Sequence, residues 1–167
     1  DRKKLIGFRH KKAQERIVHF VESSPKDQLQ PKLHSNRYLK PGDQIAQTKP
    51  HLFDIVGKKE VPLDETLFAN PWNIGSYRWE KDSSRFTFYY NQRGHDVVRI
   101  VAIDAESGAV TALIDDPSQT FVNYSNYNHR SLLESTNEMI WMSERDGWNH
   151  LYLFDFGSGK LKNQITK

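Results

Sequence analysis

The chain has no cysteine and no long apolar run. Without cysteine it cannot be held by disulfides, and cysteine-free proteins occur both inside and outside the cytosol, so the compartment stays open. No apolar run approaches the roughly 18 residues that a membrane-spanning helix needs, and no membrane span is expected. The 37% apolar, 27% charged and 12% aromatic residues are typical of a packed globular chain.

The sequence motifs that carry catalysis are also missing. There is no Gly-x-Ser-x-Gly elbow of a hydrolase, and the nearest match, residues 157–159, has the composition of a hairpin turn. There is no His-Glu-x-x-His, the seven histidines lack metal-ligand spacing, and Gly159 with Lys160 lacks the other residues of a phosphate loop. We therefore expect no catalytic residue, no metal site and no cofactor in this chain.

The distribution of charge does not indicate a nucleic-acid ligand. The 24 basic and 21 acidic residues, which give a net charge of +3, are interspersed. Only Lys3 and Lys4 with residues 9–12 form a basic cluster, which we interpret as a solvated hairpin turn rather than a phosphate-binding patch. The adjacent Asp115 and Asp116 stand just before a proline, and we expect an exposed loop there rather than a general acid–base pair.

What the sequence does contain is an internal repeat. Residues 86–110 and 139–161 each hold an aromatic or aliphatic run, a polar turn, a second apolar run that ends in Asp, and a turn with glycine. The matching positions, 52 or 51 residues apart, are Arg93 and Arg145, Asp104 and Asp155, and Gly108 and Gly159.

A period near 50 built from short strands and tight turns is typical of β-propeller blades, because helical repeats have shorter periods and a helical pattern. The runs 99–104 and 150–155 are rich in β-branched or aromatic residues, as strands are. We predict an all-β fold, a partial β-propeller of about three four-stranded antiparallel blades, with approximate boundaries 1–70, 71–118 and 119–167. Closed propellers need roughly 4–8 blades, so we expect a fragment of one propeller domain.

The repeat also predicts turns and exposure. Hairpin turns are expected at residues 92–95, 107–108, 145–147 and 158–159. Since a blade at the end of a fragment lacks one neighbour, we expect Phe8, Phe20 and Phe154 to be less protected than Phe88 and Ile100.

The first third of the chain fits the repeat less well. Residues 4–9 and 16–22 resemble a fainter copy, joined by a charged turn, and we expect them to form a hairpin. Residues 22–56 contain four prolines, which argues against a helix of any length. Two interpretations stay open: a blade whose strands are separated by a long connection, or a segment that contacts a neighbouring module.

Residues 120–130 form an aromatic and polar connection between the two clear repeats. The segment holds two tyrosines and three asparagines. Tyrosine gives contact area at low entropic cost and asparagine gives adaptable hydrogen bonds, so a recognition surface is one interpretation. Plain packing between blades is the other, and the sequence leaves both open.

Taken in order, six segments resemble the N-terminal propeller domain of the dipeptidyl peptidase IV family, which are prolyl-oligopeptidase-like serine exopeptidases. The segments are residues 38–43, 49–55, 79–82, 88–93, 120–123 and 143–152. They span essentially the whole chain, and the ordered set is more specific than any one segment. The resemblance implies an eight-bladed propeller that caps an α/β-hydrolase domain, which carries the catalytic Ser, Asp and His and is absent from this chain.

The resemblance also implies how substrate is held. A pair of Glu residues that binds the free amino terminus of the peptide would fall just upstream of Asp1. Contacts to substrate side chains would lie in the loop from Tyr124 to Tyr127, so Tyr124, Asn126 and Tyr127 are the candidate substrate-binding residues. Ser125 and Asn126 depart from the aromatic residue and the Arg familiar at these places.

On this basis the chain is expected to be the non-catalytic propeller portion of a dipeptidyl-peptidase-IV-like serine exopeptidase, which restricts access to the active site and helps to bind the peptide N-terminus. Its partners would be the C-terminal α/β-hydrolase domain of the parent chain, short peptide substrates and, in a homodimer, a second copy of the parent. A bacterial origin and a periplasmic or secreted location are expected. The alternative is a propeller interaction module of a non-enzymatic binding protein.

Overall fold

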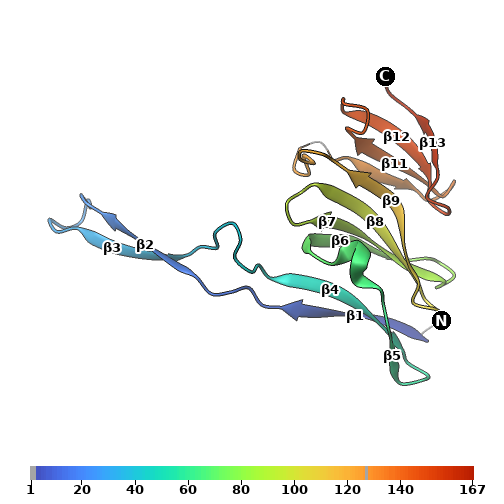
Figure 1. Cartoon of the computed structure of the whole chain (residues 1–167), viewed down its shortest axis with the longest axis horizontal. Coiled ribbons are helices and arrows are strands. Elements are labelled where there is room, and N and C mark those ends of the chain that lie inside the picture. The colour runs from blue at the N-terminus through green and yellow to red at the C-terminus, as the bar shows by residue number, and fades with distance from the viewer. Residues whose placement is uncertain (1–2, 127) are drawn as a thin grey trace. The chain divides into compact units, whose positions relative to one another are not determined.

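The computed structural model describes residues 3–126 and 128–167 (Figure 1). Regular structure among them consists of strands, apart from the single-turn 3-10 helix η1 (Glu65–Phe68). Asp64 caps this helix by accepting a hydrogen bond of 3.0 Å from the Thr66 amide. The chain divides into two compact units, one of Asp1–Arg9 with Thr48–Lys167 and one of His10–Gln47.

The first four-stranded sheet is antiparallel and has the order β6-β7-β8-β9. It consists of β6 (Pro71–Trp79), β7 (Arg85–Gln92), β8 (Val97–Asp104) and β9 (Val110–Pro117). Successive side chains of a strand point to opposite faces, so along β7 Phe86, Phe88 and Tyr90 enter one hydrophobic core and Tyr89 enters another. Both faces of this sheet are covered, which accounts for the almost continuous apolar run in β7.

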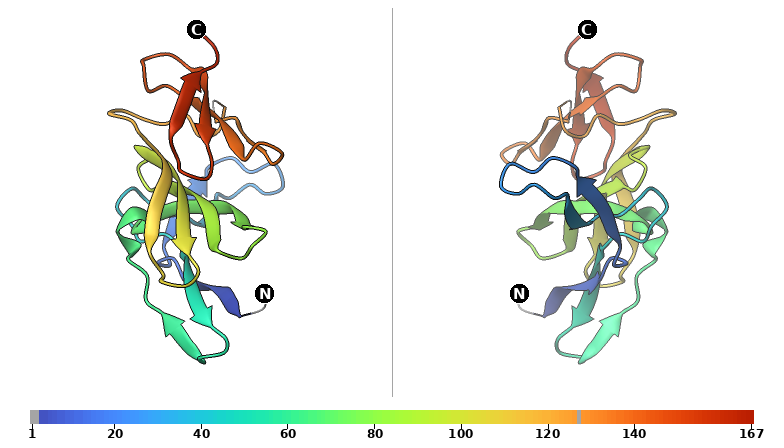
Figure 2. Two further views of the ribbon diagram at one scale, coloured as in Figure 1. Left: turned by 90° about the vertical axis from the view of Figure 1, so that its right-hand side faces the viewer. Right: turned by 90° about the vertical axis from the view of Figure 1, so that its left-hand side faces the viewer.

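The second four-stranded sheet follows the same plan, with the order β10-β11-β12-β13. It consists of β10 (Arg130–Leu133), β11 (Glu138–Ser143), β12 (His150–Asp155) and β13 (Leu161–Gln164). Trp141 of β11 and Phe154 of β12 share one core with Tyr89 of the preceding sheet. The two sheets therefore pack face to face, as neighbouring propeller blades do (Figure 2).

A three-stranded sheet precedes them, with the order β1-β4-β5. It consists of β1 (Lys4–Lys11), β4 (Gln47–Asp54) and β5 (Lys59–Val61). The Ile55 amide donates to the Lys3 carbonyl at 2.8 Å, so the end of β4 lies beside the start of β1 and the two strands are antiparallel. The sheet thus has neighbouring strands separated by a long connection, one of the two interpretations of residues 22–56.

The hairpin predicted between residues 4–9 and 16–22 is wrong. The neighbour of β1 is β4, whereas β2 (Ile17–Glu22) pairs with β3 (Lys32–Arg37). The pairing of β1 joins residues far apart in the sequence, which a local pattern cannot reveal. The basic residues Arg9 to Lys11 consequently lie in β1 and not in a turn.

The unit His10–Gln47, here called the hairpin unit, is a two-stranded antiparallel ribbon. Phe20 stacks on His34 with ring centroids 5.0 Å apart, yet Val21 and Leu33 remain 62% and 68% exposed. A hairpin without a covering layer is marginally stable by itself in water.

The glycines of the repeat lie where one sheet meets the one before it. Both have positive φ, +74° for Gly108 and +72° for Gly159. A Cβ on Gly108 would lie 2.8 Å from the Pro62 carbonyl oxygen, just after β5, and one on Gly159 would lie 2.3 Å from that of Leu113 in β9. Each turn therefore abuts the last strand of the preceding sheet, and only glycine leaves room for that contact.

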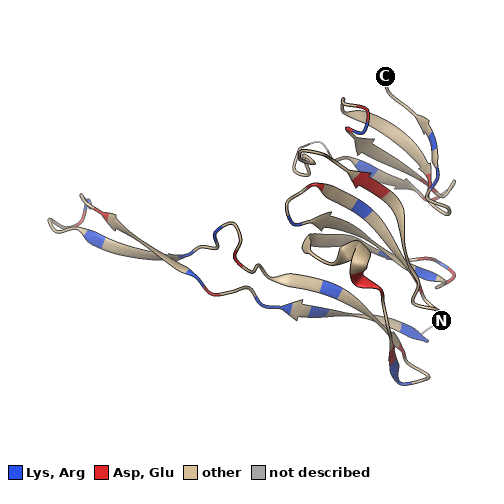
Figure 3. Ribbon diagram, in the orientation of Figure 1, with Lys and Arg blue, Asp and Glu red and all other residues tan. Residues whose placement is uncertain are grey.

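The predicted fold class is confirmed, and the four hairpin turns fall between β7 and β8, β8 and β9, β11 and β12, and β12 and β13. Phe8 and Phe20 are 44% and 49% exposed, against 1% for Phe88, as expected. The expectation for Phe154 is wrong, because this side chain points into the core between the two four-stranded sheets and is 4% exposed. Acidic and basic residues are interspersed along the strands and turns (Figure 3).

Candidate functional site

The connection between the two four-stranded sheets, residues 118–129, carries the candidate substrate-binding residues. Its backbone is tied to the turn between β7 and β8, because the Val122 amide donates to the His95 carbonyl at 2.6 Å. The Tyr124 amide in turn donates to the Val122 carbonyl at 2.8 Å. The connection is therefore held in place by the first sheet.

An aromatic cluster of Trp72, His95, Phe121 and Tyr124 fixes the same region through side chains. The His95 ring stacks on Tyr124 with centroids 4.1 Å apart and an interplanar angle of 23°. Trp72 and Phe121 meet the His95 ring edge to face, at 5.2 and 5.6 Å. Such contacts stabilise beyond the apolar area that they bury, so the cluster orients Tyr124.

His95 has an unusual backbone and a shifted proton affinity. Its φ is +60°, which is uncommon for residues other than glycine, although Asn, Asp and His adopt it more often than the rest. Burial lowers the pKa of the His95 imidazole, and the Asp96 carboxylate opposes that shift. The Nδ1 atom lies 3.0 Å from Asn91 Oδ1, and a neutral imidazole that donates there suits this environment.

The candidate residues have different surroundings. Tyr124 is half-buried by its stacking on His95. Asn126 is exposed, and its amide donates to Asn123 Oδ1 at 3.2 Å. Tyr127 lies outside the described residues.

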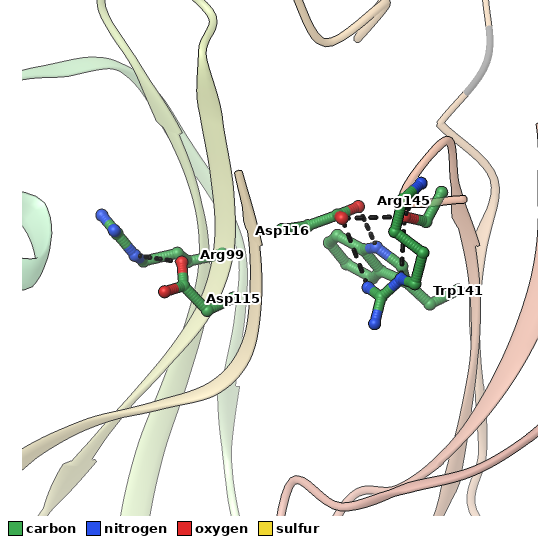
Figure 4. Close-up of polar contacts among 6 residues, drawn as sticks. Arg99, Asp115, Asp116, Trp141 and Arg145 are labelled. Carbon is green, nitrogen blue, oxygen red and sulfur yellow. Dashed lines mark hydrogen bonds and ion pairs between the residues drawn. The ribbon is translucent and has the colours of Figure 1, made fainter. Parts of the chain in front are cut away.

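A buried polar group, here called the Asp116 cluster and drawn in Figure 4, lines the same pocket as the connection. Asp116 is 7% exposed and accepts hydrogen bonds from Trp141 Nε1 at 2.8 Å and Ser143 Oγ at 2.7 Å. Arg145 Nη2 approaches the same carboxylate at 3.3 Å, and its guanidinium lies over the ring of Tyr152 at 4.9 Å. The carboxylate from one sheet is thus neutralised and hydrogen-bonded by the next.

The exposed loop expected at Asp115 and Asp116 is wrong. Both residues belong to β9, and since successive side chains alternate, they point to opposite faces. Asp115 pairs with Arg99 at 2.7 Å on one face, with half of its side chain exposed, while Asp116 is buried on the other (Figure 4). The sequence does contain a signal for this burial. Asp116 stands two residues after the buried Ile114, and residues two apart in a strand share one face.

A polar pocket of about 520 Å³ lies between the connection and the Asp116 cluster. Asp116, Ser143 and Arg145 line one side, and Phe121 and Asn123 of the connection line another. This volume falls in the range of small-ligand sites. The pocket therefore offers both hydrogen-bond donors and acceptors to a ligand.

The described residues contain neither a metal-binding cluster nor a membrane-spanning helix. No group of three or more His, Asp or Glu side chains within residues 3–126 and 128–167 could hold a metal ion. No helix in the described part of the chain is long and apolar enough to cross a membrane.

The stacked four-stranded antiparallel sheets place the chain in the class of β-propeller proteins. The family model for the dipeptidyl peptidase IV (DPP IV) N-terminal region matches residues 2–167. The chain therefore belongs to the dipeptidyl peptidase IV N-terminal region family, as the resemblance predicted.

Two bacterial crystal structures are similar to the chain. Porphyromonas gingivalis dipeptidyl peptidase 4 is 16% identical with a TM-score of 0.60, and the match covers 90% of this chain and 21% of that one. A Bacteroides ovatus protein described as a candidate dipeptidyl aminopeptidase IV is 20% identical with a TM-score of 0.57, and the match covers 94% of this chain and 22% of that one. At these identities the likeness shows the fold alone. The chain spans about a fifth of the length of either relative.

Proposed function

We propose that this chain is the non-catalytic propeller portion of a dipeptidyl-peptidase-IV-like serine exopeptidase. In this role the propeller limits access to a catalytic domain elsewhere in the parent protein and contributes contacts to the peptide. The observation that carries the proposal is the family match over residues 2–167. Cleaving an amide needs an activated nucleophile, a base held by a third group and donors for the oxyanion, and this chain is proposed to supply none of them.

Within the proposal, the connection 118–129 faces the substrate. Tyr124 has a defined orientation because His95 stacks on it, and a rigid aromatic side chain loses little entropy on binding. The adjoining pocket at the Asp116 cluster offers polar groups beside it. An ordered tyrosine next to polar groups suits a peptide with both side-chain and backbone contacts.

The test is peptide hydrolysis by the full-length protein that contains this chain. The full-length protein should cleave chromogenic Gly-Pro and Ala-Pro substrates, and the 167-residue chain alone should not. N-acetylation of the substrate should abolish cleavage, because charge-assisted hydrogen bonds would recognise the free ammonium. Equal cleavage of free and acetylated peptides would exclude an exopeptidase. Cleavage of neither would favour the non-enzymatic interaction module.

A substitution tests the role of Tyr124 in the same protein. Tyr124→Ala should raise KM about threefold to tenfold with a smaller change in kcat, as expected when binding of substrate and transition state falls equally. Trp148→Ala is the matched control, because Trp148 is 77% exposed in the turn between β11 and β12. Equal effects of the two substitutions would remove Tyr124 from the substrate site.

A further inference from the structure

A second pocket, here called the inter-sheet pocket, opens between the two four-stranded sheets and has a volume of 510 Å³. Its walls come from β6, β7 and β8 of one sheet and from β10 and β11 of the other. The polar lining includes Ser76, Arg78, Thr87, Asn128, His129 and Arg130. Asn128 and His129 belong to the connection 118–129, and the proposed function assigns no role to the side chains of the other four.

The charge of this lining is of one sign. Two guanidinium groups, those of Arg78 and Arg130, line the pocket, and none of its described lining residues is acidic. Glu134 stands outside the lining and pairs with Arg78 Nη1 at 2.7 Å. Two guanidiniums with one carboxylate leave the pocket with unbalanced positive charge, which attracts an anion.

Arg130 is held in place but not neutralised. Its guanidinium carbon lies 3.9 Å from the centroid of the Tyr89 ring, so the flat face of the group is stacked. Its Nη1 donates to Asn128 Oδ1 at 3.3 Å, and no carboxylate of the described residues lies within ion-pair distance. Stacking leaves the in-plane N–H groups of a guanidinium free of the ring, so those of Arg130 that Asn128 does not use remain for other acceptors.

Arg78 adds an unused donor. Its Nε atom is buried and has no hydrogen-bond partner among the described residues. A buried N–H without a partner is costly, so a ligand oxygen that reached it would be favoured. Both arginines therefore present N–H groups that the protein leaves unoccupied.

The rest of the lining is apolar. Ile100 of β8, Met139 of β11 and Phe156, just after β12, contribute to it. A ligand that fits this pocket must combine an anionic group with an apolar body. A carboxylate is the best-matched anion, because its two oxygens can accept the two parallel N–H groups of a planar guanidinium.

We propose that the inter-sheet pocket binds the carboxylate of a short peptide, with Arg130 and Arg78 as donors and the neighbouring peptide side chain on the apolar lining. The preference for a carboxylate follows from the lining of the pocket. The choice of a peptide as the molecule that carries this carboxylate rests on the proposed function.

The probe is N-acetyl-Ala-Leu with a free carboxylate, titrated into the 167-residue chain and followed by heteronuclear NMR. The same titration is run with the amide of that dipeptide and with inorganic phosphate. The free acid should bind saturably and shift the Nε–H signals of Arg78 and Arg130, while the amide should bind about tenfold more weakly because it loses the charge-assisted hydrogen bonds. Equal binding of acid and amide, or tighter binding of phosphate, would overturn the proposal.

Three variants locate the site. Arg130→Gln and Arg78→Gln should each weaken binding of the free acid about tenfold. Arg99→Gln is the matched control, because Arg99 also lies in a strand but pairs with Asp115 and does not line the pocket. Changes in the spectrum of Arg130→Gln away from the pocket would mean that this variant perturbs the fold. The test then rests on Arg78→Gln, and unchanged binding of the free acid in that variant would contradict the assigned site.

This binding assay needs no peptidase activity. Failure of the parent protein to cleave peptides would therefore refute the proposed function and leave carboxylate binding intact. Failure of the free acid to bind would refute the inter-sheet site and leave the peptidase assignment intact.

Discussion

Asp116 accepts a hydrogen bond of 2.8 Å from the indole Nε1 of Trp141, and the two residues belong to successive sheets. The Asp116 carboxylate is also bonded by Ser143 and approached by Arg145. This group adds polar contacts between the two sheets beside the hydrophobic core that they share.

Replacing Asp116 by Ala should lower the free energy of unfolding by about 3 kcal/mol, because it leaves buried donors and a cation without their acceptor. The adjacent Asp115→Ala is the matched control and should cost about 1 kcal/mol or less, since it removes a pair whose carboxylate is half exposed. Urea denaturation of both variants measures the difference. Equal losses would mean that the Asp116 cluster is not a stabilising link.

The glycine of the last turn gives a second prediction. Gly159→Ala should destabilise the chain by about 2–4 kcal/mol, because it combines strain at positive φ with a clash against the Leu113 backbone. Gly147→Ala is the control, since Gly147 also has positive φ, +97°, but a Cβ there would meet open space. That variant should lose about 1–2 kcal/mol from backbone strain alone. Thermal denaturation that ranks the two variants in the opposite order would contradict the close approach.

His95 predicts a pH dependence of stability. Its pKa is lowered in the folded chain, so below the ordinary value of about 6.5 the unfolded chain binds a proton that the folded chain resists. The stabilisation is therefore complete above about pH 6.5 and is lost as the pH falls from there through the lowered folded pKa. The main carboxylate facing His95 is that of Asp96, which reduces the effect.

The measurement compares the wild-type chain with His95→Asn by urea denaturation at several pH values between about 7.5 and 5. Asparagine tolerates the positive φ of this position, so the variant removes the titrating ring without forcing the backbone. The stability difference between the two proteins should shrink as the pH falls. A difference that is constant or grows on acidification would show that the His95 pKa is not lowered.

Hydrogen exchange should separate the two units. Amides of β7 and β8 lie in a sheet that is buried on both faces, and they should exchange only through global unfolding. Amides of β2 and β3 lie in a ribbon with exposed apolar side chains and should exchange at least about a hundredfold faster. Equal protection in the two regions would show that the hairpin unit is covered by a partner in solution.

The sequence predicted the parts of the fold that local chemistry determines. The turns at residues 107–108 and 158–159 need glycine in each repeat. Strands are predicted from runs in which apolar and polar residues alternate or in which all residues are apolar. The pairing of β1 with β4 could not be predicted from the sequence, because it joins residues far apart in the chain across the insertion that holds β2 and β3. The buried state of Asp116 was missed for a related reason, since its partners Trp141 and Ser143 lie in the next repeat.

The insertion between β1 and β4 has a consequence for variation. Because β1 and β4 run antiparallel as neighbours, the chain leaves the sheet at Lys11 and re-enters it at Gln47 on the next strand. The entropic cost of closing such a connection grows only with the logarithm of its length. The span from residue 12 to residue 46 can therefore be shortened, extended or exchanged while the three-stranded sheet keeps its strand order, which makes it a site where foreign sequences could be inserted and displayed.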